Sequence, residues 1–187
     1  MNKSEAKLPY RIRAALDPIP VIASLPHSGL YVPPQMRSGL KETYREFLPH
    51  QDWHLDRLYS FLPELGVTML LATYSRYVAD PNRGPDGPSF GGFWRAVVSD
   101  STPRNEPLYD LKPTKEEVEQ RLREVYRPYH DRLERLLIDT VDRFGCAYLL
   151  DLHSFGLPGD YRICFGDANG KSCREPFVAK AENAWSG

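Results

Sequence analysis

Two histidines of this chain follow short apolar runs that we predict to be strands. His27 comes shortly after the run 20–25. His153 directly follows the run 147–152, which Asp151 interrupts. Asp151 and His153 share one face of a strand, because side chains alternate along it. A metal-bound imidazole usually has a carboxylate or carbonyl on its second ring nitrogen, and Asp151 could fill that place. An ordinary strand end with a hydrogen-bonded histidine fits these residues equally well.

Two aspartates offer an oxygen ligand to accompany the histidines. Asp52 and Asp56 lie in the stretch 51–62, whose leucine spacing predicts an amphipathic helix. Residues four apart share one face of a helix, so both carboxylates would point the same way. Two histidines and one carboxylate leave a fourth position open for water, which is the ligand set of a catalytic zinc site. Manganese or cobalt would also suit these ligands.

The segment 73–83 gathers charge among aromatic residues. It contains Arg76, Asp80, Asn82 and Arg83. A pair of arginines can clamp a carboxylate through bidentate hydrogen bonds, which predicts a binding site for a small anion. For a single arginine, ordinary surface charge in a loop is the better interpretation.

Composition narrows the class of protein. The chain has 187 residues, 41% of them hydrophobic and 26% charged, with a formal net charge of −1. This balance argues against a nucleic-acid or membrane-surface partner. No apolar run approaches the roughly 20 residues of a membrane span. The three cysteines form no close pair, which indicates reduced thiols and a cytoplasmic protein.

The expected elements make an α/β protein. The sequence predicts an N-terminal tail over 1–18 and a single domain over 19–187; strands at 20–25, 67–72, 146–152 and 161–165; helices at 41–48, 51–62, 115–144 and 175–185; and a long loop over 84–113. A capping box at Thr114 begins the longest helix, Pro128 should kink it, and Gly145 should end it. His130, just after the proline, could face the site or be a partly buried structural residue.

Five motifs occur along the chain in a family-specific order. They are Ser-Leu-Pro-His27-Ser-Gly, Asp52-Trp-His-Leu-Asp56-Arg-Leu-Tyr, Tyr-Ser-Arg76-Tyr-Val-Ala-Asp80-Pro-Asn82-Arg83, Pro128-Tyr-His130 and Leu-Asp151-Leu-His153-Ser. Over about residues 19–185 the chain resembles the N-formylglutamate amidohydrolase family, which releases formate and glutamate in one route of histidine degradation. That family is similar to the zinc carboxypeptidases and aspartoacylases. The resemblance implies a three-layer fold, with a mixed sheet flanked by helices.

The resemblance also implies the metal ligands and the reaction. Zinc would be held by His27, His153 and one aspartate, would polarise the formyl oxygen and would activate the attacking water. The glutamate amine would then leave. The helix dipole explains Asp52 better than Asp56, so we prefer Asp56 as the third ligand and keep Asp52 as the alternative.

The remaining site residues take roles by the same resemblance. Asn82 and Arg83, together with Arg76, would bind the carboxylate of a small anionic N-acyl amino acid. Asp151 and His130 are the candidate catalytic residues: Asp151 would orient His153, and the role of His130 is open.

Two departures from the family pattern keep other functions open. First, the carboxypeptidase-type motif His-x-x-Glu is absent, because Leu30 stands three residues after His27 where that motif has glutamate. Second, a late glutamate that serves as general base in the family is expected beyond residue 187. We therefore expect a chain incomplete at its C-terminus, with a sheet edge that favours oligomers. General acid–base help is worth about 10²- to 10⁴-fold in rate. The alternatives are a deacylase of another N-acyl amino acid, or a metal- or carboxylate-binding remnant without turnover.

Overall fold

The structure is a computed structural model that describes residues 7–155, 164–166 and 171–173. Contacts divide the chain into two units, Met1–Ser154 and Phe155–Gly187, and the helices and strands of the described residues lie in the first. The predicted helix over 175–185 and most of the predicted strand over 161–165 lie outside the described residues. The described helices include none with the length and apolar character needed to cross a membrane.

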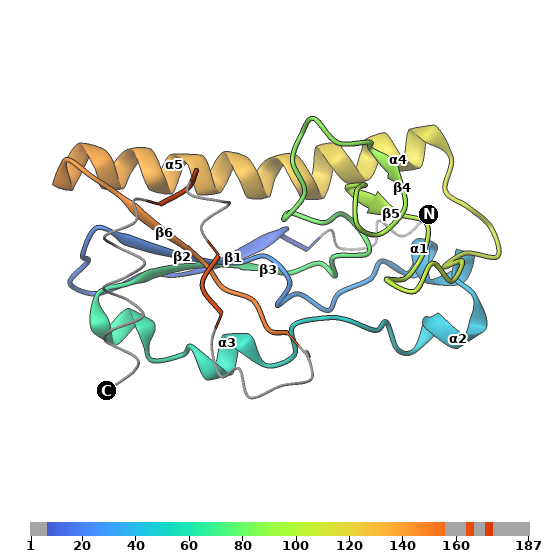
Figure 1. Cartoon of the computed structure of the whole chain (residues 1–187), viewed down its shortest axis with the longest axis horizontal. Coiled ribbons are helices and arrows are strands. Elements are labelled where there is room, and N and C mark those ends of the chain that lie inside the picture. The colour runs from blue at the N-terminus through green and yellow to red at the C-terminus, as the bar shows by residue number, and fades with distance from the viewer. Residues whose placement is uncertain (1–6, 156–163, 167–170, 174–187) are drawn as a thin grey trace. The chain divides into compact units, whose positions relative to one another are not determined.

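The first unit contains both helices and strands (Figure 1). In chain order they are β1 (Tyr10–Arg13), β2 (Val21–Leu25), α1 (Pro34–Gly39), α2 (Glu42–Arg45), α3 (Leu55–Leu58), a 3₁₀ turn (Leu62–Leu65), β3 (Thr68–Ala72), β4 (Phe90–Gly91), β5 (Val98–Ser99), α4 (Lys115–Arg121), a π-helical turn (Leu122–Tyr126), α5 (Arg127–Phe144) and β6 (Tyr148–Asp151).

The main sheet is mixed, as predicted. Its strand order is β1-β3-β2-β6; β2 runs parallel to both β3 and β6, and β1 runs antiparallel to β3. Because β2, β3 and β6 point the same way, their carboxyl ends meet at one edge of the sheet. In open α/β sheets ligands bind outside this edge. The topology thus brings the segments after three strands to one place.

Alternating side chains of β3 separate the two faces of the sheet. Met69 and Leu71 pack with Leu55 and Leu62, from the side of α3, whereas Leu70 packs with Tyr129 of α5. Figure 1 shows α5 along one side of the sheet and α3 along the other. This period of two, with buried apolar residues at all four positions 69–72, is typical of a strand buried on both faces. The chain is therefore a three-layer α/β unit, as the sequence predicted.

The longest helix begins and ends where the sequence predicted. The Thr114 hydroxyl accepts a hydrogen bond from the Glu117 amide at 3.2 Å, and the Glu117 carboxylate accepts one from the Thr114 amide at 2.8 Å. Gly145, at φ 75°, ends α5 in the left-handed region that glycine adopts without strain. Instead of a sharp kink at Pro128, the helix widens into the π-helical turn, and Figure 1 shows it running on as one rod.

Four expectations differ from the structure. Residues 10–13 of the expected tail form the edge strand β1, because Tyr10 and Ile12 supply apolar surface against α5. In the stretch 41–48 only α2 is helical, and α1 was not anticipated. The expected helix 51–62 shrinks to α3 and the 3₁₀ turn, because His54 at φ 62° cannot continue a helix. The expected buried strand 146–152 forms β6, which lies at one end of the order of the described strands, and Leu149 is 44% exposed.

Candidate metal centre

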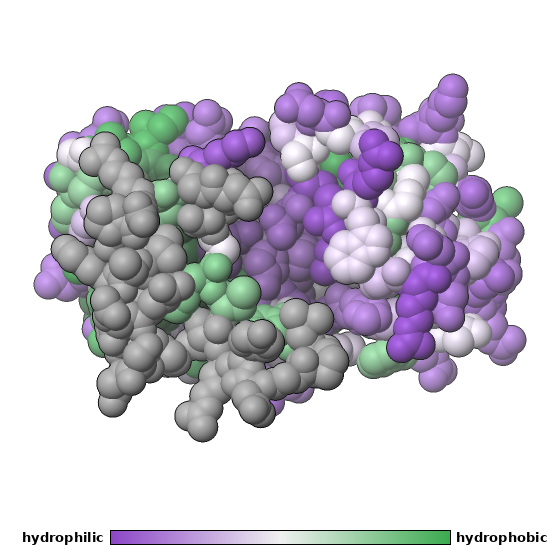
Figure 2. Space-filling view, in the orientation of Figure 1, coloured by the Kyte–Doolittle hydropathy of each residue, from purple (hydrophilic) through white to green (hydrophobic). Residues whose placement is uncertain are grey.

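Three strand ends supply the candidate site. His27 follows β2, His153 follows β6, and the segment 73–83 follows β3, so all three start from the shared carboxyl edge. Gly29 makes this convergence possible through close approach: a Cβ there would lie 2.3 Å from the Tyr74 carbonyl oxygen. On the face of the molecule that Figure 2 shows, hydrophilic side chains gather around a hollow near the middle.

Two histidines and one aspartate form a compact cluster. His27, Asp52 and His153 each offer one ligand atom, and these atoms lie within 4.8 Å of one another. Asp52 Oδ2 is 3.5 Å from His27 Nδ1 and 3.1 Å from His153 Nδ1. Ligands about 2.0–2.1 Å from a tetrahedral zinc ion lie about 3.3 Å from each other, and both distances from Asp52 Oδ2 are close to that value. His27 and Asp52 are buried, and His153 is partly exposed.

The structure brings Asp52, rather than Asp56, to the histidines. The left-handed backbone at His54 separates the two aspartates, so the argument from a shared helix face does not hold. The Asp56 carboxylate instead lies 3.7 Å from Arg11 and 3.8 Å from Arg13, both on β1. The aspartate of the cluster is therefore Asp52, the alternative carboxylate, and the preference for Asp56 is corrected.

A carboxylate holds the second nitrogen of each imidazole. Asp80 Oδ1 lies 2.7 Å from His27 Nε2, and Asp151 Oδ2 lies 3.0 Å from His153 Nε2. Such partners fix the ring orientation and leave the other nitrogen to face a metal. Strand alternation anticipated the pairing of Asp151, whereas the pairing of Asp80 was missed. Its signal was the Asp-Pro-Asn-Arg motif, which we had interpreted only as a carboxylate clamp.

The Ser154 hydroxyl was also missed. It donates to Asp52 Oδ1 at 2.9 Å, so both oxygens of this buried carboxylate have partners. The serine directly follows His153 and ends the last of the five sequence motifs. Its contact leaves Asp52 Oδ2 to face the two imidazoles.

Burial and hydrogen bonding compete in setting the charges. Burial alone would raise the pKa of Asp52, but hydrogen bonds from His153, His27 and Ser154 outweigh it and hold that pKa well below its usual range. The pKa of Asp80 is lowered in the same way, with burial opposed chiefly by His27. For His153, burial is outweighed by the bonds to Asp151 and Asp52, which raise its pKa to about 9. Both buried carboxylates are therefore anionic.

The predicted arginines meet at Asp80. Arg76 Nη2 donates to Asp80 Oδ2 at 2.7 Å, and Arg83 Nη2 lies 3.6 Å from the same oxygen. Arg83 also donates to the Phe93 carbonyl, and burial lowers the pKa of its guanidinium. Asn82 Nδ2 lies 3.0 Å from His153 Nε2. The structure thus places all three residues next to the histidine cluster.

His130 lies on α5 against the same segment. Its ring interacts with the backbone of Pro81, and its centroid is 4.4 Å from that of Tyr126. Its Nε2 atom is buried and makes no hydrogen bond among the described residues. Burial lowers its pKa. The residue thus contacts the segment that carries Asp80 and Asn82.

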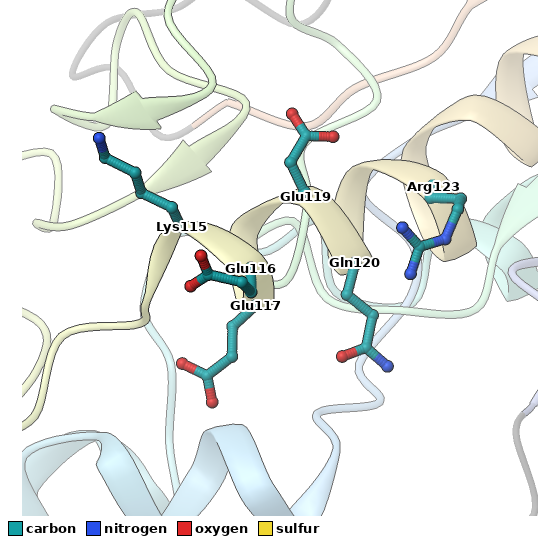
Figure 3. A pocket seen from close by; sticks show the side chains of 6 residues that line it. All are labelled: Lys115, Glu116, Glu117, Glu119, Gln120 and Arg123. Atoms are coloured by element: carbon teal, nitrogen blue, oxygen red, sulfur yellow. The ribbon is translucent and has the colours of Figure 1, made fainter.

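A separate surface hollow lies along the start of the long helix. Figure 3 shows the side chains that line it, all from the turns Lys115–Arg123 and with no member of the histidine cluster among them. It combines acidic and basic side chains of a single helix. This hollow is distinct from the histidine cluster.

Comparison with known proteins decides the family. The family model for N-formylglutamate amidohydrolase matches residues 19–187. The chain belongs to the N-formylglutamate amidohydrolase family. It is 36% identical over 174 residues to an N-formylglutamate deformylase of Pseudomonas putida, covering 87% of this chain and 64% of that protein. The deformylase of Pseudomonas aeruginosa strain PAO1 is 35% identical over 176 residues, with 88% and 65% covered. This member of the amidohydrolase family thus spans just under two thirds of the length of these relatives.

Solved structures agree with the family. The crystal structure of N-formylglutamate amidohydrolase from Ralstonia eutropha JMP134 superposes with a TM-score of 0.76 at 27% identity, covering 95% of this chain and 72% of that one. A gene product of Agrobacterium tumefaciens gives a TM-score of 0.63 at 21% identity, covering 82% of this chain and 60% of that one, and bears on the fold alone. The amidohydrolase fold predicted from the motifs is confirmed.

Proposed function

We propose that the chain is a zinc-dependent amidohydrolase that hydrolyses N-formyl-L-glutamate to formate and L-glutamate. The observation that carries the proposal is the cluster of His27, Asp52 and His153, in which each imidazole has a carboxylate behind it. The names of the two Pseudomonas relatives, N-formylglutamate deformylase, support the substrate. Manganese or cobalt is the alternative metal.

The residues of the cluster would act as ligands. His27 Nδ1, His153 Nδ1 and Asp52 Oδ2 would hold the ion. When bound, zinc polarises a carbonyl oxygen and lowers the pKa of water to about 7. Asp80 and Asp151 accept the ring protons on the far nitrogens, which keeps the near nitrogens free as donors to the metal. Asp151 is thus assigned to orienting His153.

The residues around Asp80 would bind the substrate. N-formylglutamate carries two carboxylates, and the positive charge of Arg76 and Arg83 beside the cluster suits such an anion. Arg76 Nε is buried and makes no hydrogen bond within the part of the chain that the structure describes, so it retains donor capacity. Asn82, 3.0 Å from His153, would place the substrate next to the ligands.

The proposal includes a cytoplasmic location. The three cysteines Cys146, Cys164 and Cys173 are odd in number and form no close pair in the sequence, which supports a reducing compartment.

Metal content and formate release on the purified chain test the proposal together. We expect about one equivalent of zinc, and formate released from N-formyl-L-glutamate. His153→Ala should lose the zinc, whereas Arg83→Ala should keep it and raise the KM. Asp56→Asn is the matched control for Asp52→Asn, and only the latter should weaken zinc binding. A His153→Ala protein with a full equivalent of zinc would contradict the ligand assignment; zinc without formate release would contradict the activity.

A further inference from the structure

The four-residue segment 80–83 bridges the two histidines of the cluster. At one end Asp80 Oδ1 lies 2.7 Å from His27 Nε2, and near the other Asn82 Nδ2 lies 3.0 Å from His153 Nε2. A displacement of its backbone would therefore disturb the carboxylate partner of His27 and the side chain next to His153 at once. What fixes this backbone also fixes the site.

One face of the long helix contacts the segment at two residues. The Tyr126 hydroxyl donates to the Arg83 carbonyl at 2.6 Å. The ring of His130 interacts with the backbone of Pro81, where the carbonyl is the group that can act as an acceptor, because proline has no N–H. Residues four apart lie on the same face of a helix, and the two rings are in contact at 4.4 Å between centroids.

The helix is irregular where it meets the segment. Tyr126 is the last residue of the π-helical turn, and the next amide, of Arg127, donates to the Leu122 carbonyl five residues back. The wider turn also accommodates Pro128, which cannot donate to the carbonyl four residues before it. Such turns change the direction of the side chains around them and occur frequently at functional sites. This one ends at the residue that contacts the segment.

We propose that Tyr126 and His130 are positioning residues of the metal centre. From one helical face they hold the backbone of residues 81–83, so that Asp80 and Asn82 meet the two imidazoles. His130 then acts through the segment instead of on the substrate. The metal in this proposal comes from the proposed function. The contacts of Tyr126 and His130 with the segment are present without a metal.

A hydroxyl deletion with a matched control provides the first test. Tyr126→Phe removes only the group that donates to Arg83. Tyr74→Phe removes an equivalent one, since the Tyr74 hydroxyl donates to the Lys7 carbonyl at 3.1 Å and both rings belong to one core cluster. We expect zinc affinity, measured by chelator competition, to fall roughly 10-fold for Tyr126→Phe, the lower end of the effect of outer-shell partners. Tyr74→Phe should change it less than about twofold, because its hydroxyl does not act on an outer-shell partner.

Conservative replacement separates hydrogen bonding from space filling at His130. His130→Gln keeps an N–H donor, whereas His130→Phe keeps the ring against Tyr126 and loses the donor. We expect zinc affinity and kcat near the wild-type values in the glutamine variant and a loss in the phenylalanine variant. Equal loss in both would contradict a role through the Pro81 carbonyl.

Amide exchange in the metal-free protein tests the positioning alone. The Asn82 amide donates to Asp80 Oδ1 at 2.9 Å, so its exchange reports on the order of the segment. We expect it to speed up in Tyr126→Phe and not in Tyr74→Phe. Equal exchange and equal zinc affinity in the two variants would overturn the inference. A wild-type chain that binds no zinc would overturn the proposed function, and Asn82 exchange would then decide the positioning by itself.

Discussion

Replacing Asp80 by asparagine should weaken metal binding and folding together. Asp80 is 1% exposed and accepts from His27 at 2.7 Å, from Arg76 at 2.7 Å and from the Asn82 amide at 2.9 Å. Asparagine has nearly the same shape, but it presents one amide group that donates and it carries no charge. If its oxygen serves His27, its nitrogen faces Arg76, and a buried guanidinium loses its counter-charge.

The magnitudes follow from these contacts. Breaking a buried ion pair by removing one partner costs about 3–5 kcal/mol. Because asparagine keeps the shape and one acceptor, we expect Asp80→Asn to lower the free energy of unfolding by about 3 kcal/mol, at the lower end of this range. For a chain of this size that loss lowers Tm by roughly 6–12 °C. Losing the carboxylate partner of a ligating histidine typically weakens metal binding about 10- to 100-fold, or about 1.4–2.7 kcal/mol.

Two measurements check this prediction. Urea unfolding of the metal-free protein gives the free energy of unfolding, and chelator competition gives the zinc affinity. Asp56→Asn is the matched control, because it removes a carboxylate that lies near Arg11 and Arg13 of β1 and outside the histidine cluster. Wild-type zinc affinity in Asp80→Asn would refute the reasoning that Asp80 orients His27, even if stability fell.

Three further perturbations have defined outcomes. Gly29→Ala places a Cβ 2.3 Å from the Tyr74 carbonyl oxygen, so the backbone must move; overpacking of this kind costs about 1–3 kcal/mol, and an unchanged Tm would contradict the close approach. Thr114→Ala removes the hydroxyl that caps α4 and should lower the free energy of unfolding by about 1 kcal/mol, seen as a lower urea midpoint at constant m. In the metal-free protein the pKa of His153 is raised to about 9, above its unfolded value of about 6.5, so its stabilising contribution is complete below pH 6.5 and is lost as the pH rises through 9. Unfolding of the metal-free protein at pH 6 and pH 10 measures that loss, and stability that rises over this interval in the wild type but not in His153→Ala would contradict it.

The local sequence pattern was sufficient to predict those helices and strands whose structure depends mainly on their own residues. The apolar runs 20–25 and 67–72 form β2 and β3, and the capping box and Gly145 set the ends of the long helix. Strand ends follow from strands, so His27 and His153 were predicted at the correct edge. The parallel pairing of β2 with β6 depends on residues far apart in the chain, and no local pattern encodes it.

The choice of partners within the site could not be predicted for the same reason. Asp52 and Asp56 were equivalent on a regular helix, and only the left-handed backbone at His54 separates them. Asp80 meets His27 across 53 residues, through a loop whose path depends on packing with α5. Tertiary contacts overrode the helical periodicity at Asp52 and gave the Asp-Pro-Asn-Arg motif a partner that its spacing does not indicate.

The pairing of β2 with β6 also has a consequence for how the protein matures. Asp52 and His153 are 101 residues apart, and the strand that carries His153 pairs with one near the start of the chain. Closing so long a loop costs conformational entropy before any contact repays it, and such non-local pairings slow folding. During synthesis β1, β2 and β3 leave the ribosome long before β6. The three side chains of the cluster can therefore come together only after most of the chain has been made, and a metal ion bound there would report that β6 has paired with β2.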